Sequence, residues 1–212
     1  MYSALEEQMR QHELQRDAEI VYLRDSGEQS IGSKRNALLH LAKGAFVSFV
    51  DDDDQIGPDY LPLVCEAIRR RPNVDCLGIR GVISFRGSHP REFVHSLRYR
   101  EIFSRKHAYY RPPAHLNPIR REITLRYPFA DISYSEDFDW ALRLRDDGAL
   151  KQEEFIDSPI CYYLSRRWWP YQWILDHTEI VRHRLGLMMV DRLRKRGPTI
   201  RAMQDRAEHA RG

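Results

Sequence analysis

A mostly apolar segment, residues 46–50, runs directly into four consecutive aspartates, Asp51 to Asp54. The length of this segment and its aromatic and β-branched residues predict a buried parallel strand over residues 45–50. Ligands of open α/β sheets collect just beyond the carboxyl ends of such strands. Because four adjacent carboxylates repel one another, we expect a cation at this strand end.

A divalent metal is the natural counter-charge for the acidic run. Mg²⁺ and Mn²⁺ prefer carboxylate oxygens, and proteins commonly hold them with one or two carboxylates together with substrate phosphates. The alternative is a solvated acidic loop that caps the following helix. The position of the run directly after a hydrophobic strand favours the metal site.

The composition is that of an ordinary soluble protein, with 42% hydrophobic and 31% charged residues among 212. The net charge of +3 is too small to indicate a nucleic-acid partner, and none is predicted. Arginine clusters at 69–71, 120–121 and 166–167 leave local basic patches, which suit phosphorylated ligands equally well. Neither a signal peptide nor an apolar run of about 18 residues occurs, so we expect a cytoplasmic chain without a transmembrane segment.

Cysteine and tryptophan residues add two expectations. Cys65, Cys76 and Cys161 are widely spaced in apolar segments, which favours reduced core thiols over a disulfide or zinc framework. Trp168 and Trp169 follow two arginines and suit a loop that closes over a substrate. A packing role, or contact with a membrane surface as a peripheral protein, is the alternative for these tryptophans.

The first part of the chain alternates between predicted helices and strands. We expect helices at 2–16, 33–43 and 59–70, and strands at 19–23 and 45–50. This rhythm predicts a parallel α/β sheet.

In the later part of the chain, short predicted strands replace the alternation of helices and strands. Short alternating strands, expected to form the antiparallel portion of a mixed sheet, are predicted at 76–85, 92–97, 102–110 and 119–125. A helix at 136–145 with Ser135 as N-cap and a last strand at 160–164 follow. We therefore expect one domain over residues 1–170 and a basic helical C-terminal extension over 171–212.

Three motifs occur in a characteristic order: a Gly-Ser-Lys-Arg-Asn helix start at 32–36, the acidic run about 15 positions later, and Ser-Glu-Asp at 135–137. With the Ala-Lys-Gly helix end at 42–44, this order resembles the family 2 glycosyltransferases of the nucleotide-diphosphosugar transferase (GT-A) fold. The resemblance covers roughly residues 19–144. It implies an α/β, Rossmann-like mixed and mainly parallel sheet flanked by helices, with a helical C-terminal tail.

The resemblance also implies a donor site. The donor is a nucleotide-diphosphate sugar, most simply a UDP-sugar, and the cofactor is Mn²⁺ or Mg²⁺, which neutralises the leaving pyrophosphate. Asp51 corresponds to the residue near the ribose and Asp53 to the metal ligand, with Asp51 close enough to share the metal. Asp25 corresponds to the nucleobase contact, with a simple turn aspartate as the alternative. Asp52 belongs to the donor motif but points the other way in an extended chain, and Asp54 supports the site or caps the next loop.

Lys34 and Arg35 lie at the start of a predicted helix, where the helix dipole disfavours cations. A nearby anion would explain them, and we expect both residues to contribute to the donor site; a solvated helix start is the alternative. Asn36 suits either the family motif or a turn.

Asp137 is the candidate general base. Direct displacement at an anomeric carbon requires a carboxylate that accepts the proton of the acceptor hydroxyl, and the resembled family uses the aspartate of its Glu-Asp motif. The alternative is a simple first-turn aspartate, which any helix favours. Glu136 is expected to orient the acceptor, and Trp140 to lie in the core. His115 could reach the site from a neighbouring strand, but a structural histidine is the preferred interpretation.

One feature departs from the family. The usual first strand and its nucleobase-binding turn have no counterpart, because the chain opens in what should be the first helix. We therefore expect a longer reading frame upstream, or a homodimer or other segment that covers the exposed edge at 19–23.

The predicted function is inverting transfer of a sugar to a hydroxyl of a glycan or similar acceptor. The alternatives are a non-catalytic relative that binds nucleotide sugar or glycan, and a metal-dependent phosphotransferase or nuclease. The last would need further carboxylates that converge on two metals.

Overall fold

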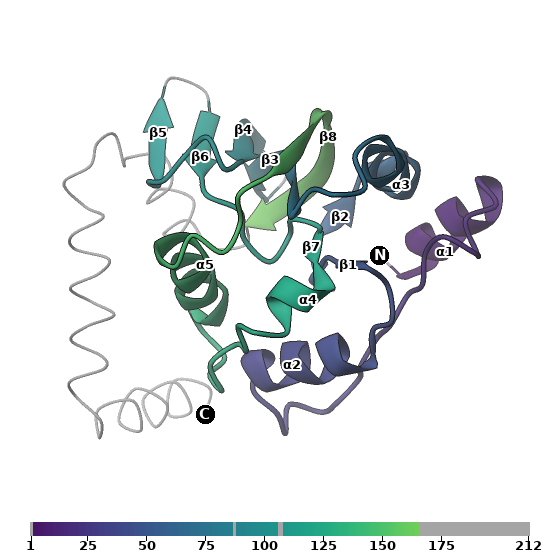
Figure 1. Cartoon of the computed structure of the whole chain (residues 1–212), viewed down its shortest axis with the longest axis horizontal. Helices are drawn as coiled ribbons and strands as arrows, with labels where there is room; N and C mark the ends of the chain where they lie inside the picture. Colours follow the sequence, from purple (N-terminus) through teal and green to yellow (C-terminus); the bar gives the residue numbers. More distant parts are fainter. Residues whose placement is uncertain (1, 87, 106–107, 166–212) are drawn as a thin grey trace. The chain divides into compact units, whose positions relative to one another are not determined.

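The computed structural model describes residues 2–86, 88–105 and 108–165 (Figure 1). Its elements, in chain order, are α1 (Tyr2–Gln11), α2 (Ile31–Leu41), β1 (Phe46–Val47), β2 (Gln55–Ile56), α3 (Tyr60–Arg70), β3 (Cys76–Phe85), β4 (Ser88–His95), β5 (Phe103–Arg105), β6 (Ala108–Arg111), β7 (Ile119–Arg120), α4 (Arg121–Thr124), α5 (Glu136–Asp146) and β8 (Glu153–Ser165). Among these residues no helix is long and apolar enough to cross a membrane. The predicted domain boundary at 170, the C-terminal extension, Trp168 and Trp169 lie outside the described residues.

The eight strands form one mixed sheet in the order β1-β7-β3-β4-β6-β5, with β8 also paired to β3, and β2 paired to β8. Only the β3–β8 and β4–β6 pairs are parallel, and the other five pairs are antiparallel. The α/β class with a mixed sheet is confirmed, whereas the prediction of a mainly parallel sheet is wrong. Short connections such as the β3–β4 turn produce antiparallel pairs, because parallel pairing needs a long crossover.

Two predicted strands near the site are shorter than expected or absent. Residues 19–23 form no strand, since no described segment pairs with them; instead Glu19 Oε1 accepts hydrogen bonds from the backbone N–H groups of Lys43 and Gly44. The segment 45–50 contributes only the two residues of β1, which are half-buried and antiparallel to β7. Beyond β1 the extended chain is held by single hydrogen bonds, including one from Phe49 N to His115 O (3.0 Å).

The remaining boundaries follow the predictions more closely. The strand at 76–85 matches β3, and the segment 102–110 is the β5–β6 hairpin rather than one strand. The segment 119–125 leaves the sheet after Arg120 and becomes α4. Ser135 is the N-cap residue of α5, as predicted, but its φ is 65° and its side chain makes no cap hydrogen bond.

The sheet separates two apolar clusters, and β3 contributes to both. Leu77, Ile79 and Ile83 pack with residues of α1 and α3 on one side. Cys76 packs on the other with Trp140, which is 1% exposed and confirms the predicted core role. The three cysteines are buried and free, as expected.

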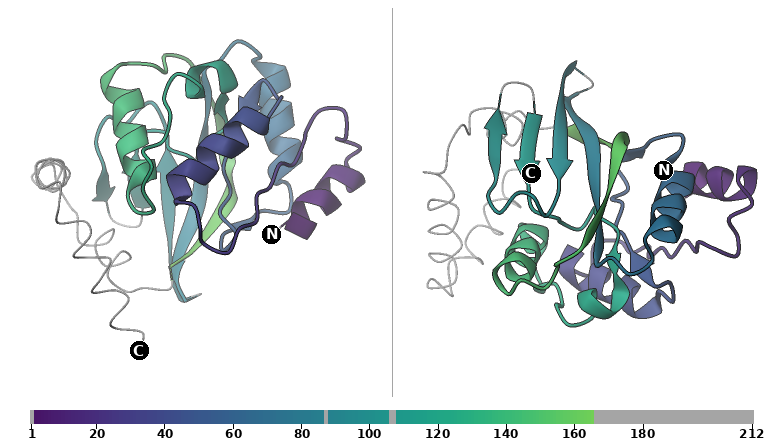
Figure 2. Two further views of the ribbon diagram at one scale, coloured as in Figure 1. Left: turned by 90° about the horizontal axis from the view of Figure 1, so that it is seen from below. Right: turned by 45° about the horizontal axis from the view of Figure 1, so that its top comes forward.

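The helices are distributed accordingly (Figure 2). Helix α3 packs against β3 and β8, and α1 lies against α3. Helix α4 contacts β1 and β7, and α2 contacts α5. The start of α2, the turn after β1 and the start of α5 therefore come together at the β1–β7 end of the sheet.

Candidate functional site

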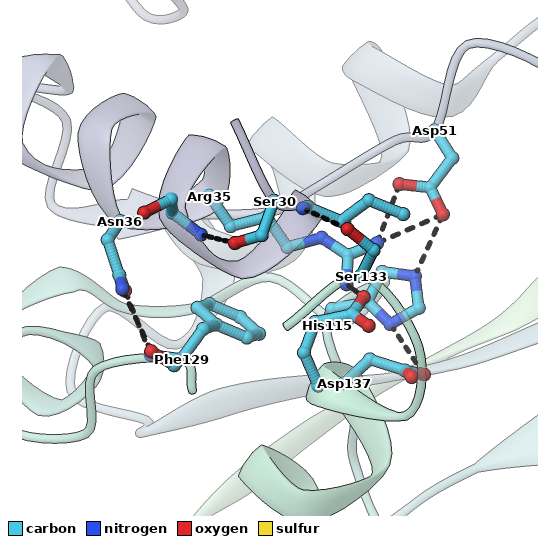
Figure 3. A network of polar contacts seen from close by, with 11 residues as sticks. Ser30, Arg35, Asn36, Asp51, His115, Phe129, Ser133 and Asp137 are labelled. Carbon is cyan, nitrogen blue, oxygen red and sulfur yellow. Dashed lines mark hydrogen bonds and ion pairs between the residues drawn. The ribbon is translucent and has the colours of Figure 1, made fainter. Parts of the chain in front are cut away.

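Four segments contribute to a network of charged side chains at this end of the sheet (Figure 3). Arg35 comes from α2, Asp51 from the turn after residues 48–50, and His115 from the connection between β6 and β7. Glu136 and Asp137 occupy the first turn of α5. The predicted donor-side and acceptor-side carboxylates thus share one site.

Arg35 is the buried centre of the network. Its Nη1 donates a hydrogen bond to Glu136 Oε1 (2.5 Å), and its Nη2 donates to both carboxylate oxygens of Asp51 (2.7 and 3.0 Å). The guanidinium also lies 6.0 Å from the ring centre of Phe49 and 5.6 Å from that of Phe129. The anions expected near Arg35 are therefore carboxylates of the protein itself.

Lys34 makes a separate ion pair. Its Nζ lies 3.0 Å from Asp25 Oδ1, and the backbone N–H of Gln29 donates to Asp25 Oδ2 (3.1 Å). The hydrogen bond from Lys34, followed by that from Gln29, lowers the pKa of Asp25. The structure brings these two predicted donor-site residues together at the start of α2.

His115 bridges the two halves of the site. Its Nδ1 lies 3.2 Å from Asp137 Oδ2, and its Nε2 lies 3.6 Å from Asp51 Oδ2. Burial opposes a charged ring, but the carboxylates of Asp137 and Asp51 outweigh it and raise the pKa of His115. The preferred interpretation of His115 from the sequence is a structural role, whereas the structure places its ring between two carboxylates of the site. A single histidine without a motif around it did not indicate these contacts.

The same contacts hold both aspartates in the charged form. Burial alone would raise the pKa of Asp137, but the contact with His115 and its charge, with the charges of Arg111 and Arg35, lower it overall. Burial is likewise outweighed at Asp51, where His115 and Arg35 lower the pKa. Asp137 is therefore an ionised carboxylate at neutral pH.

The backbone around His115 is fixed by a buried amide. Asn117 is 1% exposed, and its Oδ1 accepts a hydrogen bond from Ala114 N (2.9 Å) while its Nδ2 donates to Leu77 O (2.8 Å). The ring of His95 contacts the same Oδ1 through Nδ1 at 3.2 Å. The connection that carries His115 is thereby tied to β3 and β4.

The Gly-Ser-Lys-Arg-Asn motif has a packing role as well. A Cβ on Gly32 would lie 1.8 Å from Ala130 O, so only glycine permits this close approach. Asn36 exchanges two hydrogen bonds with the backbone of Phe129, at 2.9 and 2.8 Å. Together with Arg35, these residues hold the start of α2 against the segment that leads into α5.

The four aspartates of the acidic run have different environments. Asp52 and Asp53 are exposed, whereas Asp54 is 6% exposed and its Oδ1 has no hydrogen-bond partner among the described residues. Burial, followed by the charges of Asp51 and Asp53, raises the pKa of Asp54 to about 7. The backbone N–H of Asp54 donates to Asp51 O (3.1 Å), which closes a turn.

No group of three or more Cys, His, Asp or Glu side chains among the described residues is arranged to hold a metal. One or two carboxylates with substrate phosphates are nevertheless the usual ligands of Mg²⁺ and Mn²⁺. The unpartnered oxygen of Asp54 and the exposed carboxylate of Asp53 suit such a cation. The predicted metal ligands Asp53 and Asp51 differ in availability, because Asp51 is engaged by Arg35 and His115.

Residues 3–127, more than half of the chain, match the model of the family described as Glycosyl transferase family 2. The chain belongs to this family. The family match ends before α5 and does not include Asp137.

Among solved structures, the chain is similar to TarS of S. aureus. The TarS 1–349 complex with UDP-GlcNAc is 16% identical, with a TM-score of 0.44, over 75% of this chain and 46% of that one. A longer TarS structure is 17% identical, with a TM-score of 0.41, over 65% of this chain and 25% of that one. The chain thus spans less than half the length of these proteins. No curated protein matched significantly.

Proposed function

We propose that this family 2 glycosyltransferase moves a sugar from a nucleotide-diphosphate sugar to a hydroxyl of a glycan or similar acceptor, with inversion. The observation that carries the proposal is the single network in which His115 and Arg35 join Asp51 of the acidic run to the first turn of α5. An acidic donor motif and a separate ionised carboxylate are the two parts that this reaction requires. A UDP-sugar is the first donor to test, since TarS was crystallised with UDP-GlcNAc.

On the donor side, Asp53 with Asp51 or Asp54 would hold Mn²⁺ or Mg²⁺, which supplies positive charge to the leaving pyrophosphate. Asp25 and Lys34 lie at the neighbouring start of α2, where we assign them to the nucleotide. Asp52 is assigned no direct contact, because it is an exposed middle residue of the turn.

On the acceptor side, Asp137 accepts the proton of the attacking hydroxyl. His115 contacts Oδ2 of this carboxylate, so we assign proton acceptance to Oδ1. The cationic ring fixes the orientation of Asp137 and keeps it ionised, at the cost of lower basicity. Glu136 positions the base indirectly through its bond to Arg35.

The test is Asp137→Asn, with Asp146→Asn at the far, exposed end of the same helix as the matched control. The amide is nearly isosteric but cannot accept a proton, so turnover should fall by about 10²–10⁴ while nucleotide affinity stays near wild type. UDP release from a panel of UDP-sugars with Mn²⁺ measures turnover, and calorimetry measures nucleotide binding. Full turnover in the Asn variant would place the base elsewhere.

The same experiment addresses the alternative of a non-catalytic relative. That alternative predicts Mn²⁺-dependent UDP binding by the wild type without turnover on any donor. A phosphotransferase or nuclease is less favoured, because the described residues do not offer the cluster of carboxylates that two metals require.

A further inference from the structure

Arg111, the last residue of β6, is a buried cation that the proposed reaction leaves unused. It is 9% exposed and stands opposite His95 in the parallel β4–β6 register. Its Nε and Nη2 have no hydrogen-bond partner among the described residues. Buried polar groups are almost always hydrogen-bonded, and an unpaired buried charge is costly. Such a group calls for an anion that binds it.

The surroundings of Arg111 do not supply that anion. Burial, followed by the charge of Arg111, lowers the pKa of His95 far below its usual value, so this neighbour is neutral. Tyr109 lies two residues earlier on the same strand and face, and its hydroxyl interacts with Arg111; burial raises the pKa of this hydroxyl, so Tyr109 is a neutral partner and not an anion. The charge of Arg111 acts on Asp137, but His115 already contacts that carboxylate at 3.2 Å.

The position of Arg111 favours the acceptor over the donor. Its charge contributes to the ionisation of Asp137, whereas Arg35 and His115 are the cations that act on Asp51 and Asp54. The side chain of Asp137 is 26% exposed, so solvent, and therefore an acceptor, reaches the carboxylate that Arg111 neighbours. Arg111 ends β6, four residues before His115, whose Nδ1 lies 3.2 Å from Asp137 Oδ2, so the guanidinium belongs to the Asp137 side of the network.

We infer that Arg111 binds an anionic group of the acceptor, a phosphate or a carboxylate, close to the hydroxyl that Asp137 deprotonates. A guanidinium matches both groups through two parallel N–H···O bonds, which also fix the orientation of the acceptor. The acceptor is then an acidic glycan or polyol rather than a neutral sugar. This inference rests on the proposed function, because that function makes Asp137 the base.

The test compares glycerol, glycerol 3-phosphate and glycerate as minimal acceptors for the full chain with UDP and Mn²⁺. Ligand-detected NMR gives their affinities for the wild type, Arg111→Gln and Arg111→Lys. Arg105→Gln, an exposed position on the adjacent strand of the same hairpin, is the matched control. UDP release from UDP-sugars in the absence of acceptor is measured on the same proteins.

We expect the wild type and Arg105→Gln to bind at least one of the two anions about tenfold or more tightly than glycerol. Arg111→Gln should lose this preference, and Arg111→Lys should keep part of it, because the charge remains without the planar fork. If the Gln variant does not fold, a loss of threefold or more in the Lys variant still supports the inference. The phosphate-to-carboxylate ratio identifies the class of anion.

Two results would overturn the inference: no anion preference in the wild type, or an undiminished preference in both Arg111 variants. Donor hydrolysis separates this failure from failure of the proposed function. If the wild type releases UDP but shows no preference for an anion, the proposed function is supported and the Arg111 site is wrong. If the preference depends on Arg111 but no UDP is released, the anion site is supported and the proposed glycosyl transfer is not.

Discussion

Removal of Arg35 should destabilise the protein more than removal of any surface arginine, because it leaves two carboxylates without their partner. The side chains of Arg35 and Glu136 are only 6% and 5% exposed, whereas that of Asp51 is 41% exposed. Breaking a buried ion pair by removing one partner costs about 3–5 kcal/mol, and the exposed Asp51 contact adds at most about 1 kcal/mol. We therefore expect Arg35→Met to lower the free energy of unfolding by about 3–5 kcal/mol, measured by urea denaturation.

The cost should depend on Glu136. In a Glu136→Gln background no buried charge is left unpaired, so Arg35→Met should cost about 2 kcal/mol less than in the wild type. Arg69→Met is the matched control, because Arg69 pairs with Asp17 at 2.6 Å and the two side chains are 57% and 42% exposed. It should cost less than about 1 kcal/mol. Equal costs of Arg35→Met in both backgrounds, or a cost as small as that of the control, would refute the buried-pair argument.

Two further predictions concern the acidic run. Asp53→Ala should abolish Mn²⁺-dependent nucleotide binding in calorimetry, whereas Asp52→Ala should change it little, and equal losses would remove the distinction between them. The pKa of Asp54 is raised to about 7 in the folded state, above its unfolded value, so its contribution to stability is present at low pH and is lost as pH rises through 7. Chemical denaturation in EDTA should therefore show Asp54→Asn to be more stable than the wild type at pH 8, by about 2–4 kcal/mol, with little such gain at pH 4. A difference in stability that does not change with pH would contradict this prediction.

Local patterns in the sequence predicted the elements that depend on local interactions. Helix α3 and strand β3 follow from apolar spacing and β-branched content, and their observed bounds match closely. The direction of strand pairing does not follow, because it depends on which strands become neighbours. Residues 19–23 have strand composition, but no described segment pairs with them. Residues 119–125 are predicted as one strand, but only Ile119 and Arg120 pair in the sheet, and the chain then forms α4.

In the site, too, the sequence indicated which residue types are functional but not which residues contact one another. The acidic run could be recognised as a cation site from its composition and its place after an apolar segment, and the Glu-Asp pair from the resemblance to the family 2 glycosyltransferases. The helix-dipole argument correctly required an anion near Arg35, but the two anions lie 16 and 101 positions away along the chain. No pattern in the sequence indicated that either carboxylate would meet that guanidinium.

His115 and Arg111 extend this argument to the residues that were undervalued or missed. Each is a single basic residue in an ordinary segment, and its significance arises only where the connection after β6 approaches the first turn of α5. Their two positive charges, with that of Arg35, outweigh the burial penalty of Asp137 and keep it ionised. His115 and Arg35 are already engaged by protein carboxylates, whereas Nε and Nη2 of Arg111 have no hydrogen-bond partner in the described part of the chain. On the proposed acceptor side, the described residues therefore leave a positive charge for a substrate, where the attacking hydroxyl would be held beside the proposed base.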